Sequence, residues 1–352
     1  MENMQAAVFL GEKLLELQTR KIPEIKDGSI LIRVESCAIC GSDLRIFKHG
    51  NERVIPPRII GHEVAGEIIE IGSGVSSQYK IGDRVSVGAD VPCGNCTFCL
   101  SGRANCCDVN LAIGYQFDGG FSQYMLLDPL VVSGGPLQKF ETNIDFDTAA
   151  LSEPLACCLN GYEVGLIKPN STVVVFGAGP IGIMLVTLGL SYFEAARIIV
   201  IDPNKERLEL AKTFGANHIL NPNETDVIAS VLELTNGMGA NMIFTACPDV
   251  GTHEQAIAMV AKRGVINLFG GLPKSCRPIQ FYSNQLHYRE AYLTGSHGST
   301  PKQHQLAVKL ITDKKINISS LISHRFKLDQ INEAFAQAAS GQSMKVIIKP
   351  NA

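Results

Sequence analysis

The sequence lacks a long apolar run, a block of basic residues and an internal repeat, and each absence excludes a class of protein. No apolar stretch among the 352 residues approaches the roughly 20 residues that a membrane-spanning helix needs. The net charge is −3 and no segment is rich in lysine or arginine, so the basic surface of a nucleic-acid-binding protein is missing. The first five residues lack the basic segment and apolar core of a signal peptide. We therefore expect a cytoplasmic protein that binds neither membranes nor nucleic acid.

Cysteine, by contrast, is plentiful and unevenly placed. Of the 11 cysteines, four have the spacing C-x2-C-x2-C-x7-C, namely Cys93, Cys96, Cys99 and Cys107. In a cytosolic protein such clustering favours a metal over disulfides. Four thiolates suit a closed tetrahedral zinc site, which holds a loop and does no chemistry. An iron–sulfur cluster is the main alternative, and the neighbouring Cys106 could replace Cys107 as the fourth ligand.

Residues 1 to about 150 are typical of a β-rich domain. Short runs of alternating apolar and polar residues recur, with turn-forming glycines between them. The strands that we predict cover residues 6–10, 30–34, 64–71, 84–87 and 124–127. Regular spacing of this kind favours a small barrel or sandwich.

From about residue 171 the pattern changes to alternating strands and helices. The predicted strands cover residues 173–176, 198–201, 218–220, 242–245 and 265–269, with 292–294 as a candidate sixth. The predicted helices cover residues 181–190, 205–214, 225–234 and 252–261. This alternation predicts a parallel sheet with helices on both faces. Beyond residue 298 we predict helices at 303–312 and 328–339 and a strand at 345–348.

A glycine-rich turn follows the first strand of this second region. Gly177, Gly179 and Gly182 match the pattern G-x-G-x-x-G between a strand and a helix, with Pro180 and Ile181 inside it. The first glycine permits a tight turn, and the second lets the backbone approach a pyrophosphate at the helix N-terminus. The third allows the helix to pack closely on the strand. The pattern predicts a dinucleotide site that includes all five residues.

Asp202 indicates which dinucleotide is bound. It stands 20 residues after Gly182, where a carboxylate accepts hydrogen bonds from a ribose 2′-hydroxyl and repels a 2′-phosphate. NAD is therefore favoured over NADP. Lys205 and Arg207 could reach a 2′-phosphate, but we interpret them mainly as solvated helix residues, with Arg207 beside the adenosine ribose.

The segment from Cys40 to Asp43, with Ser42 inside it, combines a thiol, a hydroxyl and a carboxylate. About twenty residues later comes a glycine followed by His62 and Glu63. Thiolate, imidazole and carboxylate groups are the ligands that zinc prefers. A cysteine and a distant histidine are also common in protein cores, so these pieces alone leave a metal site and a structural role both open.

Together these motifs resemble those of the zinc-containing medium-chain dehydrogenases/reductases, in their sorbitol dehydrogenase-like branch. The resemblance covers essentially the whole chain in the family's order and spacing. Its landmarks are Cys40 to Asp43, Gly61-His62-Glu63, the four-cysteine lobe, Ser152-Glu153-Pro154 and Gly177 to Gly182. Residues 40–47 also resemble bacterial galactitol-phosphate dehydrogenases. The resemblance implies an α/β fold with a β-rich GroES-like catalytic domain and a Rossmann doubly wound parallel-sheet domain.

The resemblance also implies NAD and two zinc ions per chain. The catalytic zinc would be held by Cys40, His62 and Glu153, and Glu63 can exchange on and off the metal in relatives. Glu153 stands where polyol and threonine dehydrogenases have a glutamate and other alcohol dehydrogenases have a cysteine. The family pattern places the structural zinc on Cys93, Cys96, Cys99 and Cys107.

The chemistry of these residues suits alcohol oxidation. Zinc lowers the pKa of a bound hydroxyl, which must lose its proton before hydride leaves the carbon. Ser42 could carry that proton away, although a serine in a turn can instead bond to the backbone. Asp43 could orient His62 through its other ring nitrogen. Many alcohol dehydrogenases have a histidine where this sequence has Arg45, which stays charged, so the proton path beyond Ser42 is open.

We therefore predict an NAD- and zinc-dependent oxidoreductase that acts on a secondary alcohol of a polyol, sugar alcohol or sugar-alcohol phosphate. A threonine dehydrogenase-like enzyme is the alternative, which residues 44–47 favour less. A regulatory protein that binds nucleotide or zinc without catalysis is the third reading. The set Cys40, His62 and Glu153 argues against it, because a binding module needs no open metal site. The resemblance implies a homo-oligomer, either a tetramer or a dimer.

The length suggests two domains. We expect residues 1–155 and 298–352 to form the catalytic zinc domain, with the structural zinc lobe at 93–107. Residues 156–297 would form the NAD-binding Rossmann domain, with the active site in the cleft between the two.

Overall fold

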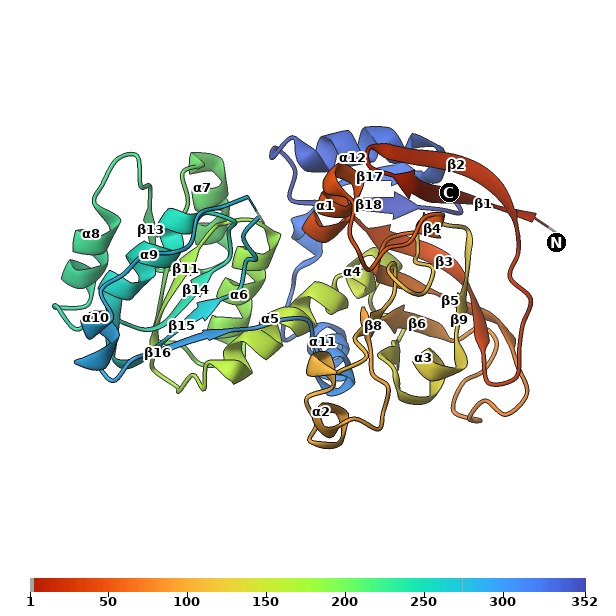
Figure 1. Ribbon diagram of the computed structural model, residues 1–352, viewed down its shortest axis with the longest axis horizontal. Helices are drawn as coiled ribbons and strands as arrows, with labels where there is room; N and C mark the ends of the chain where they lie inside the picture. Colours follow the sequence, from red (N-terminus) through yellow and green to blue (C-terminus); the bar gives the residue numbers. More distant parts are fainter. Residues whose placement is uncertain (1–2, 274) are drawn as a thin grey trace. The chain divides into compact units, whose positions relative to one another are not determined.

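The computed structural model describes residues 3–273 and 275–352, and the chain divides into two compact units. One unit consists of Met1–Cys157 together with Gly298–Ala352, and the other of Cys158–His297. Figure 1 labels most of the helices and strands named below. Among the described residues, no helix is both long and apolar enough to cross a membrane.

The first unit is built mainly from antiparallel sheets around one large apolar core. Its largest sheet has the strand order β10 (Leu137–Lys139), β6 (Arg84–Val87), β5 (Glu63–Ile71), β3 (Ile30–Ala38), β18 (Lys345–Lys349) and β17 (Ile322–Lys327), and β9 (Tyr124–Leu127) also pairs with β3. The smaller sheets contain β2 (Leu14–Lys21), β1 (Asn3–Gly11) and β4 (Arg58–Ile59), and β7 (Asp90–Val91) with β8 (Leu111–Ala112). The predicted β-rich domain is therefore observed.

Short helices connect these strands. They are α1 (Gly41–His49), α2 (Thr97–Leu100), α3 (Pro129–Gly134), α4 (Phe146–Ala150), α11 (Pro301–Thr312) and α12 (Ile331–Ala339), with 3-10 turns η1 (Ala104–Cys106), η2 (Ser319–Leu321) and η3 (Leu328–Gln330). Helix α5 (Ser152–Val164) begins in the first unit and continues into the second. The predicted helix over 328–339 therefore starts as a 3-10 turn.

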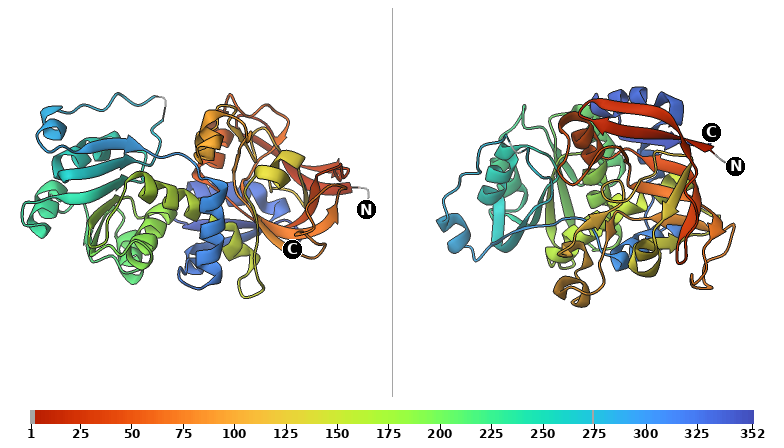
Figure 2. Two further views of the ribbon diagram at one scale, coloured as in Figure 1. Left: turned by 90° about the horizontal axis from the view of Figure 1, so that it is seen from below. Right: turned by 45° about the vertical axis from the view of Figure 1, so that its right-hand side comes forward.

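The end of the chain completes the sheet that the beginning of the chain starts. Strand β18 lies between β3 and β17, with Ile347 opposite Ala38 and Ile348 opposite Cys37. Helix α12 packs against β18, and both views in Figure 2 show these C-terminal elements beside N-terminal ones. The first unit therefore depends on segments from both ends of the sequence.

Asp147 in α4 ties the C-terminal segment to the N-terminal strands. Its carboxylate accepts hydrogen bonds from Lys349 Nζ and Arg325 Nε, each at 2.6 Å, and from the hydroxyl of Ser36. Burial opposes the charged form, but these hydrogen bonds outweigh burial and lower the pKa of Asp147 below its ordinary value.

We expect this carboxylate to make stability depend on pH in the acid range. Because its pKa is lower in the folded than in the unfolded chain, its stabilising effect is present above the ordinary carboxyl pKa of about 3.9 and disappears as the pH falls below it. Urea unfolding from about pH 7 to about pH 3 measures this effect. Asp147→Asn should be less stable at neutral pH and should lose less stability on acidification, and parallel curves for the two proteins would contradict the assignment.

The second unit contains one six-stranded parallel sheet. Its strand order is β13 (His218–Leu220), β12 (Arg197–Ile201), β11 (Thr172–Phe176), β14 (Ala240–Thr245), β15 (Val260–Leu268) and β16 (Tyr292–Gly295). The connecting helices are α6 (Pro180–Ser191), α7 (Lys205–Thr213), α8 (Val227–Leu234), α9 (Val250–Met259) and α10 (Asn284–His287). The first strand in sequence is central and the order reverses there, as in a Rossmann fold, where ligands bind at the carboxyl ends of the strands. The predicted α/β class is confirmed.

Capping side chains, more than apolar periodicity, decide where helices α8 and α9 begin. Asp226 accepts hydrogen bonds from the N–H groups of Ile228 and Ala229, so α8 starts two residues later than predicted. Asp249 caps α9 in the same way through the N–H of Thr252. Residues 260–261, predicted as helix, instead open β15 because Val260 pairs with β14.

Candidate active site and metal centres

Asp43 organises the start of α1 and lies at the centre of the candidate active site. Cys40 directly precedes the helix, and its N–H donates to Asp43 Oδ2 at 2.9 Å. A short polar side chain in the first turn commonly satisfies a free N–H at a helix start. This hydrogen bond fixes the backbone that carries the thiol of Cys40.

The other carboxylate oxygen of Asp43 faces His62. Asp43 Oδ1 lies 3.4 Å from His62 Nδ1, and neither buried atom has another hydrogen-bonding partner among the described residues. On the opposite side of the ring, His62 Nε2 lies 3.3 Å from Ser42 Oγ. Burial would lower the pKa of His62, but the charges and hydrogen bonds of Asp43 and Cys40 together outweigh burial and raise that pKa well above its ordinary value. Surroundings that favour a positive charge on the ring also favour a nearby metal cation.

The potential ligand atoms of Cys40, His62 and Glu63 form one cluster, all within 4.8 Å of one another. Both oxygens of the buried Glu63 carboxylate accept hydrogen bonds from Lys345 Nζ in β18, which is also buried. A thiol, an imidazole and a carboxylate at this spacing fit the ligand preferences of zinc. Lys345 ties Glu63 to the C-terminal strand, so Glu63 has two competing partners when a metal is bound.

Glu153 lies outside this 4.8 Å cluster but interacts with its charges. It is buried in the first turn of α5, where its Oε1 accepts a hydrogen bond from Cys157 Sγ at 3.5 Å. Burial raises the pKa of Glu153 to about 7, with Glu63 acting in the same direction and His62 opposing it. A carboxylate that is costly to ionise alone is stabilised by a bound cation. Glu153 can therefore complete a zinc ligand set.

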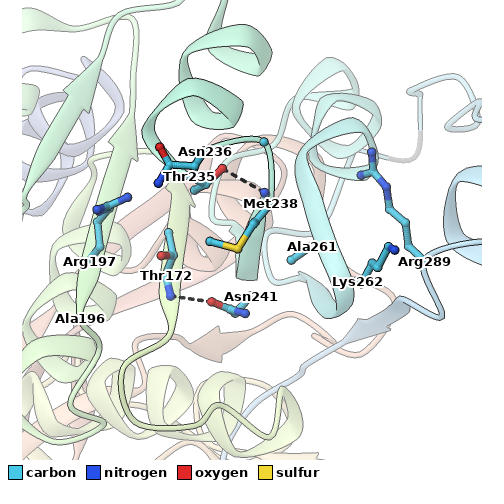
Figure 3. A pocket seen from close by; sticks show the side chains of 12 residues that line it. Thr172, Ala196, Arg197, Thr235, Asn236, Met238, Asn241, Ala261, Lys262 and Arg289 are labelled. Carbon is cyan, nitrogen blue, oxygen red and sulfur yellow. Dashed lines mark hydrogen bonds between the residues drawn. The ribbon is translucent and has the colours of Figure 1, made fainter.

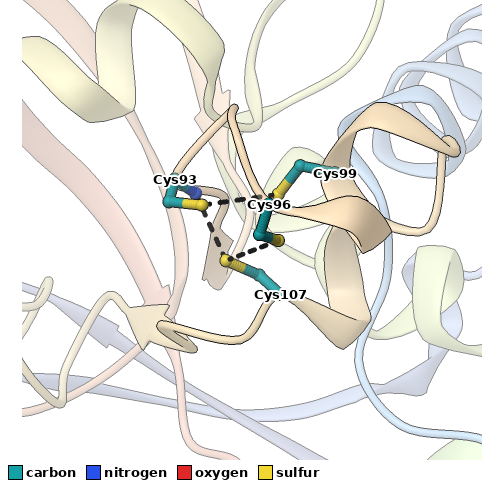
Figure 4. A group of neighbouring side chains, drawn as sticks. All are labelled: Cys93, Cys96, Cys99 and Cys107. Carbon is teal, nitrogen blue, oxygen red and sulfur yellow. Dashed lines mark hydrogen bonds between the residues drawn. The ribbon is translucent and has the colours of Figure 1, made fainter.

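Four cysteines between β7 and β8 converge on one point (Figure 4). They are Cys93, Cys96, Cys99 and Cys107. The Sγ atoms lie 3.9 Å apart in both the Cys93–Cys99 and Cys96–Cys107 pairs. Thiolates about 2.3 Å from a tetrahedral zinc lie about 3.8 Å apart, so these residues fit a single zinc ion. Cys106 is exposed and lies outside the group, which favours Cys107 as the fourth ligand.

The surroundings of these thiols favour metal binding. Burial would raise the pKa of Cys107, but backbone N–H groups of Cys93, Val109 and Asn110 outweigh it and lower that pKa to about 6. Burial raises the pKa of Cys99 to about 12, and its neighbouring thiols add to the effect. The thiolate is the form that binds metal, and a central cation would relieve the repulsion among four of them.

The glycine-rich turn joins β11 to α6. Gly177 has a φ of 98°, and a Cβ there would lie 2.9 Å from Ala246 O, while a Cβ on Gly182 would lie 1.8 Å from Gly177 O. A Cβ on Gly179 would meet only the Arg207 guanidinium, at 3.9 Å. No side chain caps α6, whose first residues are Pro180 and Ile181. Open space beside uncapped N–H groups is what a pyrophosphate needs.

Asp202, at the end of β12, supports the glycine-rich turn as well as facing it. Its Oδ2 accepts a hydrogen bond from the N–H of Ala178 at 2.7 Å, and its Oδ1 accepts one from Asn204, also at 2.7 Å. Each carboxylate oxygen has a second lone pair. Asp202 can therefore accept a ribose hydroxyl while it holds the turn, and replacing it would disturb both.

A pocket of about 820 Å³ lies at the opposite ends of the same strands (Figure 3). Two of its lining residues, Thr172 and Arg197, begin β11 and β12. The guanidinium of Arg197 binds the carbonyl of Leu234, and that of Arg289 binds two other backbone carbonyls. The two arginines of the pocket therefore stabilise the backbone around it. The pocket is also remote from the carboxyl ends of the strands, where Rossmann ligands bind.

Sequence reasoning missed two residues near the candidate site. Lys345, which binds Glu63, is 282 positions away from it. The ring of Tyr115 lies 6.2 Å from that of His62 between centroids, and the guanidinium of Arg53 lies 4.9 Å from the Tyr115 centroid. For Lys345 the sequence did offer a signal, namely a lysine at the start of the apolar run 345–348. A buried charge requires a partner, so such a lysine indicates a nearby carboxylate.

Replacing Asp43 by asparagine tests its action on both neighbours. The amide keeps the shape of the side chain but removes the charge beside His62, so zinc affinity or turnover should fall about 10- to 100-fold. Zinc retention during dialysis against a chelator and kcat/KM measure these effects. Asp83→Asn is a matched control, since Asp83 also accepts the N–H of the residue three positions earlier but lies in an exposed turn. Equal behaviour of the two variants would contradict the role of Asp43.

Comparison with known proteins identifies the family. Residues 26–133 match the alcohol dehydrogenase GroES-like domain, and residues 180–313 match the zinc-binding dehydrogenase domain. A sorbitol dehydrogenase of Bacillus subtilis is 32% identical over 99% of this chain and 98% of its own length. An L-threonine 3-dehydrogenase of Pyrococcus horikoshii is 32% identical over 96% of this chain and 94% of its own.

Solved structures agree with these relatives. A zinc-binding dehydrogenase from Sinorhizobium meliloti, bound to NADP, superposes with a TM-score of 0.92 at 28% identity, covering 99% of this chain and 100% of the other. Galactitol-1-phosphate dehydrogenase from Escherichia coli superposes with a TM-score of 0.89 at 26% identity, covering 99% and 100%. The chain is a member of the zinc-containing alcohol dehydrogenases of the medium-chain dehydrogenase/reductase family, and an oxidoreductase acting on alcohols.

Proposed function

We propose that this enzyme interconverts a secondary alcohol of a polyol, sugar alcohol or sugar-alcohol phosphate and the corresponding ketone, with NAD as the hydride carrier. The observation that supports it most is the cluster of Cys40, His62 and Glu63 with the buried Glu153 nearby. Glutamate in place of a further cysteine is the feature by which the chain resembles polyol and threonine dehydrogenases. The sorbitol and galactitol-phosphate dehydrogenases among its relatives support the same substrate class.

Three residues would hold the catalytic zinc, namely Cys40, His62 and Glu153. When bound there, zinc acts as a Lewis acid and lowers the pKa of a substrate hydroxyl toward neutrality. The carboxylate of Glu63 would exchange between the zinc and Lys345, which is its partner in the structure. Glu63 thus offers a spare carboxylate when a ligand enters or leaves.

Ser42 and Asp43 would serve proton transfer and orientation. Ser42 Oγ, 3.3 Å from His62 Nε2, would take the proton of the substrate hydroxyl. Asp43 would hold His62 with Nε2 directed to the metal. Arg45 is exposed, and a guanidinium group does not act as a proton shuttle, so Arg45 does not extend the proton path. Water, Glu63 or a ribose hydroxyl of the cofactor would carry the proton onward.

The cofactor would bind at the glycine-rich turn. Gly177, Gly179, Pro180, Ile181 and Gly182 would form the pyrophosphate site. The carboxylate of Asp202 would accept the ribose hydroxyl, which favours NAD. Arg207, whose guanidinium approaches Gly179, would flank the adenosine ribose.

The cysteines Cys93, Cys96, Cys99 and Cys107 would hold the structural zinc. A homo-oligomeric state, tetramer or dimer, remains part of this proposal.

An amino-alcohol dehydrogenase is the second candidate function. The threonine dehydrogenase relative, 32% identical, favours it, and the same ligand set serves both substrate classes. Residues 44–47, Leu-Arg-Ile-Phe, resemble the polyol enzymes more. A non-catalytic regulatory role fits least, because a regulatory zinc site needs no buried carboxylate beside it.

A panel of polyols, polyol phosphates and threonine, each with NAD and with NADP, tests the proposal. Reduction of the cofactor is followed by absorbance. We expect the highest kcat/KM with a polyol or polyol phosphate and with NAD. Turnover confined to threonine would contradict the substrate class, and a preference for NADP would contradict the role given to Asp202.

A further inference from the structure

His304 is fully buried beside the start of the helix that carries Glu153. It belongs to α11, and its Nε2 lies 3.1 Å from Ser86 Oγ in β6 and 3.1 Å from Ser152 Oγ in α5. The two hydroxyl oxygens are 2.7 Å apart. Three segments far apart in the sequence therefore meet at one ring nitrogen.

The acceptors in this network determine where its protons lie. Ser152 Oγ is 2.7 Å from the carbonyl oxygen of Ala149, which can only accept, so Ser152 donates there. Ser86 then donates to Ser152, and His304 Nε2–H donates to the pair of hydroxyl oxygens. The opposite tautomer would leave an N–H at His304 Nδ1, which has no partner among the described residues. Folded proteins rarely tolerate a buried N–H without an acceptor.

The imidazole of His304 is a rigid neutral donor rather than a charge. Burial lowers its pKa to about 3, so it is uncharged at neutral pH. The ring also fills a confined space, since a Cβ on Gly88 would lie 3.3 Å from its Cγ. Its position and its hydrogen are therefore both fixed.

We propose that His304 is a positioning residue for Glu153, acting through Ser152. These two residues are consecutive in the first turn of α5, where the backbone N–H groups have no intrahelical partners. Anchoring Ser152 to β6 and α11 fixes the direction in which the Glu153 side chain leaves the helix. The inference rests on the proposed function, in which Glu153 is a ligand of the catalytic metal. Such a ligand must be held within about 0.5 Å of its productive position.

The test compares His304→Gln with His304→Asn. The amide nitrogen of glutamine reaches the place of Nε2, whereas that of asparagine reaches only the place of Nδ1. We expect His304→Gln to keep most of its activity and His304→Asn to lose about 10- to 100-fold in kcat. His304→Asn should also release its catalytic zinc faster to a chelator, while its Kd for NADH stays unchanged. Wild-type kcat and zinc retention in His304→Asn would overturn the proposal.

Two further variants separate the possible causes of a loss. Ser29→Ala removes a fully buried hydroxyl of the same unit whose hydrogen bonds are to Lys26, and should lower thermal stability without changing kcat. If His304→Asn likewise changes only stability, its role is structural and the inference is wrong. Glu153→Gln is measured in parallel. Wild-type turnover in Glu153→Gln would refute the proposed role of Glu153, and the inference with it, whereas loss in Glu153→Gln with none in His304→Asn refutes the inference alone.

Discussion

Cys40→Ala is expected to remove one of two zinc ions per chain and to lower kcat/KM by at least about 1,000-fold. The thiolate of Cys40 is the one sulfur ligand in the cluster with His62 and Glu63, so its loss leaves too few donors to retain zinc. Loss of a metal that stabilises developing charge costs several kcal/mol, and about 4 kcal/mol corresponds to three orders of magnitude in rate. Metal analysis after gel filtration and steady-state kinetics measure the two effects together.

The neighbouring cysteine Cys37 provides a matched control. It is fully buried in β3, and its sulfur packs close to Gly61 and Gly120. Cys37→Ala should therefore lower stability modestly while both zinc ions and turnover remain. If Cys40→Ala retained both zinc ions, or retained turnover with one, the catalytic metal site assigned here would be wrong.

Cys96→Ala is expected to remove the other zinc and to unfold the loop from Cys93 to Cys107. The regular structure of this loop is limited to the short α2 and η1. Its four thiols lie within 4.8 Å of one another, so a metal bound there would hold the loop together. Zinc binding contributes about 10–16 kcal/mol in small zinc-dependent domains, so without the ion the loop has little to hold it. Limited proteolysis should give new cleavage between residues 93 and 107, with the Rossmann unit intact.

The adjacent exposed thiol separates metal binding from general cysteine effects. Cys106→Ala should retain the second zinc and resist proteolysis like the wild type, because Cys106 lies outside the four-thiol group. If Cys106→Ala lost the metal and Cys107→Ala kept it, the fourth ligand would be Cys106. Four thiols binding iron instead would appear as visible absorbance and iron in the metal analysis.

Features whose chemistry is local could be predicted from the sequence. The family, the α/β fold and the four-cysteine cluster rest on residues close together in the chain, such as Cys93 and Cys96 or Gly177 and Gly182. Helix boundaries were less accurate, because caps such as Asp226 compete with the apolar pattern. The strands β2 and β17 were missed because much of their surface is exposed, which leaves little apolar alternation to detect.

Contacts that depend on the assembled sheets could not be predicted. Lys345 meets Glu63 only because β18 pairs with β3, which in turn pairs with β5. His304 meets Ser152 only because α11 lies beside the start of α5. The supporting role of Asp202 for the N–H of Ala178 was also hidden, since a ribose contact and a turn contact require the same carboxylate.

The insertion of β18 between β3 and β17 has a consequence for biosynthesis. The ribosome makes β3 early but makes β18 only after the whole Rossmann unit, a delay of about 15 to 60 seconds at roughly 5–20 residues per second. The Rossmann unit is continuous in sequence and can fold while the chain is still being made. Until β18 is made, the first unit has an unpaired edge at β3, and Glu63 has no contact with Lys345. During this interval the unpaired edge favours aggregation, because an exposed strand can pair with another chain.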